Sequence, residues 1–83
     1  MIKLEKDNTE QPKMKSLDKA LKLLECFGSV TPELGITELA RILELHKSNV
    51  FNIVATFEQH GYLEKNKATG KYRLGLKLLE FSY

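Results

Sequence analysis

The fold is decided by one stretch, ITELARILELHKSNVFNIVATFEQHGYL, which spans residues 36–63. Its first half has the apolar spacing of a short amphipathic helix. After the polar segment that begins at His46, a second apolar series recurs every three or four residues until Gly61 breaks it. That series is Val50, Ile53, Val54 and Phe57. Two short helices separated by a brief polar break are typical of a helix-turn-helix motif.

The outer face of the second helix is polar and uncharged. With successive residues about 100° apart around the axis, this face is formed by Ser48, Asn52, Ala55 and Gln59, with Asn49, Phe51 and Thr56 beside it. Asn and Gln can pair with adenine through two hydrogen bonds, Ser is adaptable, and Phe can contact a thymine methyl group. Any amphipathic helix has a polar outer face, so each side chain can equally be hydrated. The lack of charge from Ser48 to Thr56 favours base contact.

A further helix is predicted before this motif. Ser16 precedes a helical pattern that stops at Gly28 and consists of Leu17, Ala20, Leu21, Leu24 and Phe27, with Leu23 beside this row. Residues 29–35 predict a loop, followed by a very short strand at Ile36. Thr37 is the expected N-cap of the next helix, which should end near Glu44 or Leu45.

A β-hairpin is predicted after the motif. Residues 62–65 and 71–74 are the expected strands, and the turn-rich segment 66–70 joins them. The apolar run from residue 76 to residue 81 then predicts a helix. Two roles remain open for it: closing the core under the first helix, or leading out of the domain as a linker.

Positive charge is concentrated in the second half of the chain. Residues 1–45 hold seven Lys or Arg against eight Asp or Glu, whereas residues 46–77 hold six against two. The basic residues on or beside the hairpin are Lys65, Lys67, Lys71 and Arg73, opposed by Glu64 alone. Such a hairpin indicates contact with phosphate. The alternative is an edge hairpin that its lysines protect from unwanted pairing.

Composition indicates one small soluble domain. The chain has 83 residues, of which 42% are apolar and 29% charged, and it lacks an apolar run long enough to span a membrane. Residues 1–15 lack the features of a signal peptide and are expected to be a disordered tail. Cys26 is the single cysteine, so no internal disulfide can form. The expected compartment is the cytoplasm.

The sequence argues against an enzyme, a metal site or a cofactor. His46 and His60 fall at opposite ends of the second motif helix, roughly 20 Å apart along its axis, and cannot share a site. They fit a helix entry and a helix C-terminus. Cys26 has no Cys/His/Asp arrangement around it, which favours a half-buried structural thiol. No glycine-rich phosphate loop or paired-carboxylate cleft is present.

Three collinear segments resemble the N-terminal winged-helix domain of IclR-family transcriptional regulators. They are SLDKALKLLECF, GITELARILELHKSNVFNIVATFEQHGYL and TGKYRLGLKLLEF, and the resemblance covers residues 16–81. It implies a mainly helical winged helix-turn-helix with a three-helix core, a small hairpin wing and the start of a linker helix. It also implies a homodimer that binds double-stranded operator DNA, with the second motif helix in the major groove and the wing on the backbone or minor groove.

The chain departs from the family pattern in two respects. Family members often carry Arg where this chain has Asn52 and Thr where it has Asn49, so an operator sequence cannot be transferred. The family also continues into a C-terminal domain that senses a small-molecule effector, whereas this chain stops at Tyr83. We therefore expect either a fragment or a naturally short relative, without effector binding of its own.

The working hypothesis is sequence-specific DNA binding by a transcriptional regulator. The predicted units are a winged helix-turn-helix domain over 16–75, with the motif at about 36–55 and the wing at about 62–74, and a linker helix that starts in 76–83. The expected base-contacting residues are Ser48, Asn49, Phe51 and Asn52. The expected backbone-contacting or wing residues are Thr37, Lys47, Lys67, Thr69, Gly70, Lys71 and Arg73. The alternative is a winged helix that uses the same helical face to bind a protein.

Overall fold

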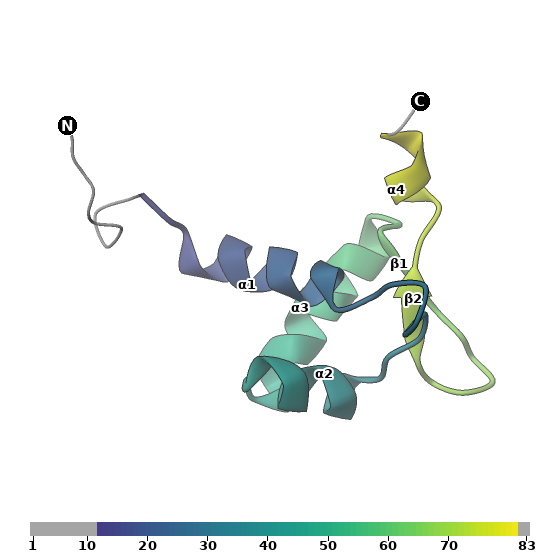
Figure 1. Cartoon of the computed structure of the whole chain (residues 1–83), viewed down its shortest axis with the longest axis horizontal. Helices are drawn as coiled ribbons and strands as arrows, with labels where there is room; N and C mark the ends of the chain where they lie inside the picture. The colour runs from purple at the N-terminus through teal and green to yellow at the C-terminus, as the bar shows by residue number, and fades with distance from the viewer. Residues whose placement is uncertain (1–11, 82–83) are drawn as a thin grey trace.

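The computed structural model describes residues 12–81 and confirms a mainly helical winged helix-turn-helix. Its elements in chain order are α1 (Lys15–Glu25), α2 (Ile36–Leu43), α3 (Lys47–Gln59), β1 (Leu63–Lys65), β2 (Tyr72–Leu74) and α4 (Lys77–Glu80). Figure 1 shows α2 and α3 joined by a tight turn and the hairpin following the C-terminal end of α3. Of the expected disordered tail, residues 1–11 lie outside the described residues, whereas Lys15 begins α1.

A single apolar core joins the three main helices to the hairpin. Its buried members are Leu23, Phe27, Leu34, Leu39, Ala40, Val50, Val54, Leu63 and Tyr72. Fully burying a Leu or Val side chain stabilises the folded state by about 1.5–3 kcal/mol. Val50 and Val54 are fully buried, and this burial fixes which face of α3 points outward.

The first helix is shorter than its apolar pattern predicted. It ends at Glu25, because the N–H groups of Cys26 and Phe27 bond to carbonyls only three residues earlier and tighten the last turn. Phe27 therefore joins the core from the following turn. The predicted start is also wrong by two residues, since Met14 is the N-cap, Lys15 begins the helix and Ser16 lies inside it.

The core-facing row of α1 also differs from the prediction. Leu23 is fully buried, while Leu17 and Leu21 of the predicted row remain 53% and 49% exposed. The two leucines line one side of a shallow apolar groove of about 500 Å³, and Ile53 and Phe57 of α3 line the other. Leu17 and Leu21 therefore lie near α3 but outside the buried core.

The start of α2 is set by a contact that reaches backwards along the chain. Gly35 is the N-cap, and its N–H donates to the carboxylate of Glu38 in the first turn at 2.8 Å. The predicted Thr37 cap is wrong, since Thr37 is the second residue of the helix. The predicted strand at Ile36 is also wrong. The extended pairing occurs two residues earlier, where Leu34 forms a β-bridge with Tyr72.

The turn of the helix-turn-helix is short and left-handed at one residue. Helix α2 ends at Leu43, and Glu44 follows with φ 56° and ψ 47°. The backbone N–H of Leu45 then bonds to the carbonyl of Ala40 at 3.0 Å. This bond satisfies a backbone carbonyl in the last turn of α2, and the chain then reaches His46, the N-cap of α3.

The hairpin forms where it was predicted, and each strand begins one residue later than expected, at Leu63 and Tyr72. Leu63 pairs with Leu74, Glu64 with Arg73 and Lys65 with Tyr72 in antiparallel register. Two further backbone hydrogen bonds join Leu34 to Tyr72, at 3.0 and 2.8 Å. The segment before α2 therefore acts as a third, very short strand that ties the hairpin to the helices.

The last helix does not close the core under α1. None of the residues of α4 is buried, and the flanking Leu76 and Phe81 are 68% and 69% exposed. Figure 1 places α4 away from α2, on the far side of the hairpin. Its aromatic attachment is Phe81, whose ring centroid lies 5.9 Å from that of Tyr62. Across residues 12–81, no helix has the length and apolar character needed to cross a membrane.

Candidate nucleic-acid interface

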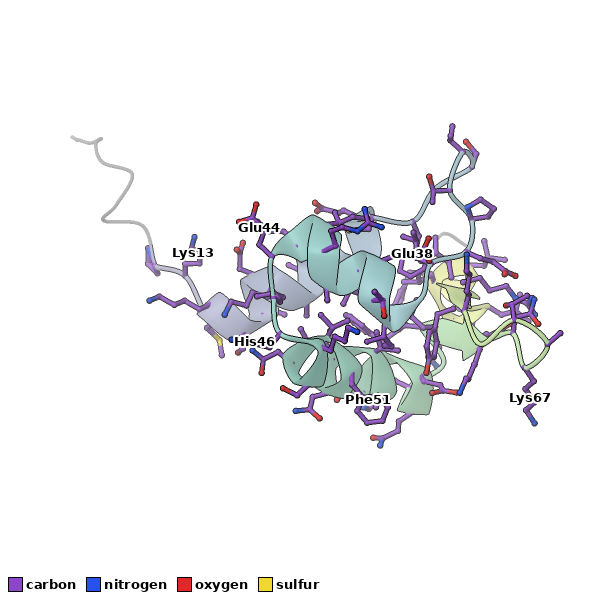
Figure 2. All side chains as sticks on the ribbon, turned by 90° about the horizontal axis from the view of Figure 1, so that it is seen from below. Lys13, Glu38, Glu44, His46, Phe51 and Lys67 are labelled. Atoms are coloured by element: carbon purple, nitrogen blue, oxygen red, sulfur yellow. The ribbon has the colours of Figure 1, made fainter. Side chains whose placement is uncertain are left out.

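The outer face of α3 is open along the first half of the helix. The four expected base-contacting residues, Ser48, Asn49, Phe51 and Asn52, are all exposed. Phe51 is 55% exposed although it is large and apolar, and Figure 2 shows its ring projecting away from the helical core. An apolar ring presented between amide and hydroxyl groups matches the edge of a base pair, which offers hydrogen-bonding atoms and, at thymine, a methyl group.

The second half of this face is less available. Ala55 is half-buried, and the hydroxyl of Thr56 donates to the backbone carbonyl of Asn52 at 2.8 Å. Thr56 is thus engaged with its own helix. The exposed polar surface is therefore continuous over the first two turns of α3 and reappears at Gln59.

The start of α3 offers positive charge and backbone donors. The helix has His46 as its N-cap without a side-chain hydrogen bond at that position. The exposed Lys47 follows, and no carboxylate within residues 12–81 forms an ion pair with it. N–H groups at the beginning of a helix attract anions. Lys47 and this helix terminus are together suited to a phosphate group.

The wing, residues 62–74, contains two cations that form ion pairs with carboxylates and two that form none with the described part of the chain. Lys71 lies 3.5 Å from the carboxylate of Glu38, and Arg73 lies 3.8 Å from Glu33 and 3.5 Å from Glu64. Lys65 and Lys67 form no ion pair with the described part of the chain, although the Lys65 ammonium lies 5.9 Å from the Tyr72 ring centroid. Two of the four predicted phosphate-binding cations are therefore already neutralised within the molecule.

The remaining expected contact residues lie at the loop tip and on α2. Thr69 and Gly70 are exposed in the loop, where Gly70 has a φ of 77°. Thr37 is exposed in the first turn of α2. In Figure 2, Phe51 and Lys67 project toward the same edge of the molecule, whereas Glu44 lies at the opposite edge. The structure thus brings the outer face of α3 and the wing tip to one side.

Three carboxylates of the wing network were not predicted as site residues. Glu33 and Glu38 come from the segment before α2 and from its first turn, and Glu64 comes from β1. Glu38 has a lowered pKa, first because it accepts the Gly35 N–H and then because Lys71 is close by. No sequence signal identified these partners, because residues 1–45 hold nearly balanced charge, with seven Lys or Arg against eight Asp or Glu.

The residues that suggested other chemistry are not assembled into a site. Cys26 is half-buried, and its pKa is raised by burial and by the neighbouring Glu25. Its sulfur contacts the backbone carbonyl of Lys22 at 3.4 Å. Residues 12–81 contain no group of three or more His, Cys, Asp or Glu side chains that could hold a metal ion.

Comparison with known proteins identifies the family. The model of the IclR helix-turn-helix domain matches residues 16–67. The chain belongs to the IclR family. It is 39% identical over 69 residues to the HTH-type transcriptional regulator XynR of Escherichia coli, covering 83% of this chain and 27% of that regulator. It is 37% identical over 71 residues to the regulator KipR of Bacillus subtilis, covering 86% and 28%.

Solved IclR structures have the same fold. An IclR-family regulator from Brucella abortus superposes with a TM-score of 0.82 at 28% identity, covering 90% of this chain and 29% of that one. One from Rhodococcus superposes with a TM-score of 0.78 at 29% identity, covering 96% and 31%. This chain therefore matches the helix-turn-helix domain of IclR-family transcriptional regulators, and it spans about a quarter of the length of its curated relatives.

Proposed function

We propose that α3 enters the major groove of double-stranded DNA while the wing contacts the backbone or the adjacent minor groove. The observation that carries this proposal is the uncharged, exposed first half of α3. Lys47 at its start and Lys67 at the wing tip form no ion pair with a carboxylate of residues 12–81, and Lys67 projects to the same side as Phe51. Cations that flank an uncharged polar face match phosphates on either side of base edges.

The side chains divide between two tasks in this arrangement. Bases are contacted by Ser48, Asn49, Phe51 and Asn52, while Lys47 and Lys67 bind phosphates. Thr37 adds a hydrogen bond to the DNA backbone. Thr69 and Gly70, whose donors bond to Glu33 and Asn66 within the protein, shape the wing tip that lies against the DNA. Lys71 and Arg73 lie beside the DNA and keep their ion pairs with carboxylates.

The full-length regulator is proposed to be a homodimer. Two copies would place their α3 helices on successive major-groove faces about 34 Å apart. We propose residues 16–75 as the DNA-binding unit and 76–83 as the start of a linker to a domain that binds a small-molecule effector. Ligand control would then act on the DNA-binding unit through α4.

In vitro selection from random duplexes tests the proposal directly. The chain is fused to a dimerising coiled coil, and bound duplexes are recovered at low salt and eluted by raising the salt concentration. A recovered motif with two symmetric half-sites supports DNA binding, because phosphate contacts make retention salt-dependent. Failure to retain any duplex would contradict it and would favour a protein as the partner of the α3 face.

Two substitutions separate base contact from phosphate contact. Asn52→Ala should narrow the affinity gap between the selected duplex and a random duplex by about 1–3 kcal/mol. Lys67→Ala should weaken binding to both duplexes alike and should reduce the slope of log K against log salt concentration by about one unit. Fluorescence anisotropy titrations over a range of salt concentrations measure both quantities. If both variants changed the affinity gap equally, this division of roles would be wrong.

A further inference from the structure

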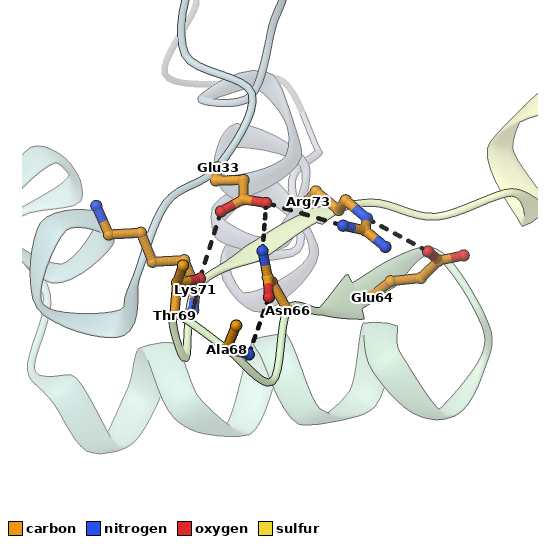
Figure 3. Close-up of polar contacts among 7 residues, drawn as sticks. All are labelled: Glu33, Glu64, Asn66, Ala68, Thr69, Lys71 and Arg73. Atoms are coloured by element: carbon orange, nitrogen blue, oxygen red, sulfur yellow. Dashed lines mark hydrogen bonds and ion pairs between the residues drawn. The ribbon is translucent and has the colours of Figure 1, made fainter.

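One carboxylate holds the loop of the wing from outside the hairpin. Glu33 lies just before the Leu34 bridge, and its side chain is 28% exposed. It accepts a hydrogen bond from the side-chain amide of Asn66 at 3.0 Å and one from the hydroxyl of Thr69 at 3.4 Å (Figure 3). The Arg73 guanidinium lies 3.8 Å from the same carboxylate.

The two loop residues that Glu33 contacts are also the ones that shape the loop. The Asn66 side chain accepts the backbone N–H of Ala68 at 2.9 Å, and the Asn66 carbonyl accepts that of Gly70 at 2.7 Å. The Thr69 hydroxyl accepts the backbone N–H of Lys71 at 3.2 Å. Such side-chain to backbone bonds define a turn. Glu33 therefore fixes the turn through both ends of the loop.

Lys67 sits inside the segment held in this way. It lies between Asn66 and Ala68, which are joined by the side-chain bond just described. Lys67 itself forms no ion pair with the described residues, and Figure 2 shows its side chain extending outward from the loop. Glu33 thus orders the backbone beneath Lys67 without neutralising the Lys67 ammonium.

The negative charge of Glu33 is unfavourable for DNA binding, so its position beside the wing calls for a favourable effect that offsets this repulsion. A carboxylate beside a DNA-binding wing repels phosphate, and it also occupies Arg73. A flexible loop would lose conformational entropy when it docks on DNA, whereas a loop ordered in advance has already lost it. The hydrogen bonds of Glu33 supply this ordering.

We propose that Glu33 is a positioning residue for DNA binding, which acts by presenting Lys67 to the DNA backbone. This inference rests on the proposed DNA contact of the wing. It assigns to the segment before α2 a role in setting wing geometry, separate from its role in packing against β2.

A pair of substitutions at Glu33 separates charge from hydrogen bonding. Glu33→Gln and Glu33→Ala remove the same negative charge, but the glutamine keeps an oxygen that can accept from Asn66. We expect Glu33→Gln to bind the selected duplex at least as tightly as the wild type. Glu33→Ala should bind about 5- to 10-fold more weakly than Glu33→Gln, as expected for losing one or two hydrogen bonds. Glu25→Gln, which changes an exposed residue of α1 by the same charge, is the control.

The Lys67→Ala background distinguishes positioning from general destabilisation. If Glu33 acts through Lys67, the difference between Glu33→Ala and Glu33→Gln should fall to less than about twofold once Lys67 is removed. Without DNA, amide hydrogen exchange at Ala68 and Lys71 should be faster in Glu33→Ala than in Glu33→Gln, since their acceptors lose support. Both variants should remain folded by circular dichroism, because Glu33 lies outside the apolar core.

The outcomes distinguish this inference from the proposed function. Equal affinities of Glu33→Ala and Glu33→Gln, in a protein whose wild type binds the duplex, would overturn the positioning role alone. So would a difference that persists unchanged in the Lys67→Ala background. A wild type that binds no duplex at low salt would instead overturn the DNA contact of the wing, and the Glu33 role would fall with it.

Discussion

At the scale of single residues, Glu38 connects the first turn of α2 to the wing. Its carboxylate accepts the Gly35 N–H and lies 3.5 Å from the Lys71 ammonium, and its pKa is lowered in the folded state. The unfolded chain therefore binds the proton at a higher pH than the folded chain. The stabilisation by Glu38 should be complete above the ordinary Glu pKa and should be lost as the pH falls through the lowered value.

Thermal unfolding of the wild type and of Glu38→Gln over this acidic range measures the effect. The difference in melting temperature should be largest near neutral pH and should shrink as the pH decreases. Glu58→Gln, at an exposed position on α3, is the matched control for the removal of one carboxylate. If the difference in melting temperature between the wild type and Glu38→Gln grew toward acidic pH, the stabilising role of the ionised Glu38 carboxylate would be contradicted.

At the scale of elements, the passage from β2 to α4 depends on a close backbone approach at Gly75. A Cβ atom there would overlap the carbonyl oxygen of Gly61 and lie 3.1 Å from the backbone carbon of Tyr62. Gly75→Ala should therefore lower the free energy of unfolding by about 1–3 kcal/mol. Gly28→Ala is the control, because no atom lies within 4 Å of its Cβ position. Urea denaturation that gave equal stabilities would contradict this account of the junction.

Sequence patterns predicted the elements well and the packing between them less well. The 3.6-residue period identified α1, but α1 carries two neighbouring apolar rows, and the pattern could not show that Leu23 rather than Leu17 and Leu21 faces the core. The exposed face of α3 was predictable because one apolar row is fully opposed by a polar one. The contacts of Glu33 were not, since they join residues 33 and 36 positions apart in the chain.

At the scale of the whole molecule, two cations of the basic second half of the chain are paired with carboxylates from the first half. The folded chain brings Glu33 and Glu38 against Arg73 and Lys71, so the formal charge of residues 46–77 overstates what the surface offers to DNA. The family and its fold follow from the linear pattern. The number of cations free for phosphate follows only from the tertiary structure.

The salt dependence of DNA binding should reveal that number. If only Lys47 and Lys67, the two lysines proposed to bind phosphate, contact the DNA backbone, the slope of log K against log salt should be about −1.8 per chain. If Lys71 and Arg73 also exchanged their carboxylates for phosphates, the slope would approach about −3.6. We expect the shallower slope. If Lys71 or Arg73 left its carboxylate for a phosphate, that carboxylate would stand unneutralised beside the DNA, and its repulsion of the phosphates would offset the attraction of the new contact. Lys77→Ala should leave the slope unchanged, since Lys77 pairs with Glu80 on α4. A steeper slope in anisotropy titrations of the single chain would show that the wing opens its ion pairs on binding.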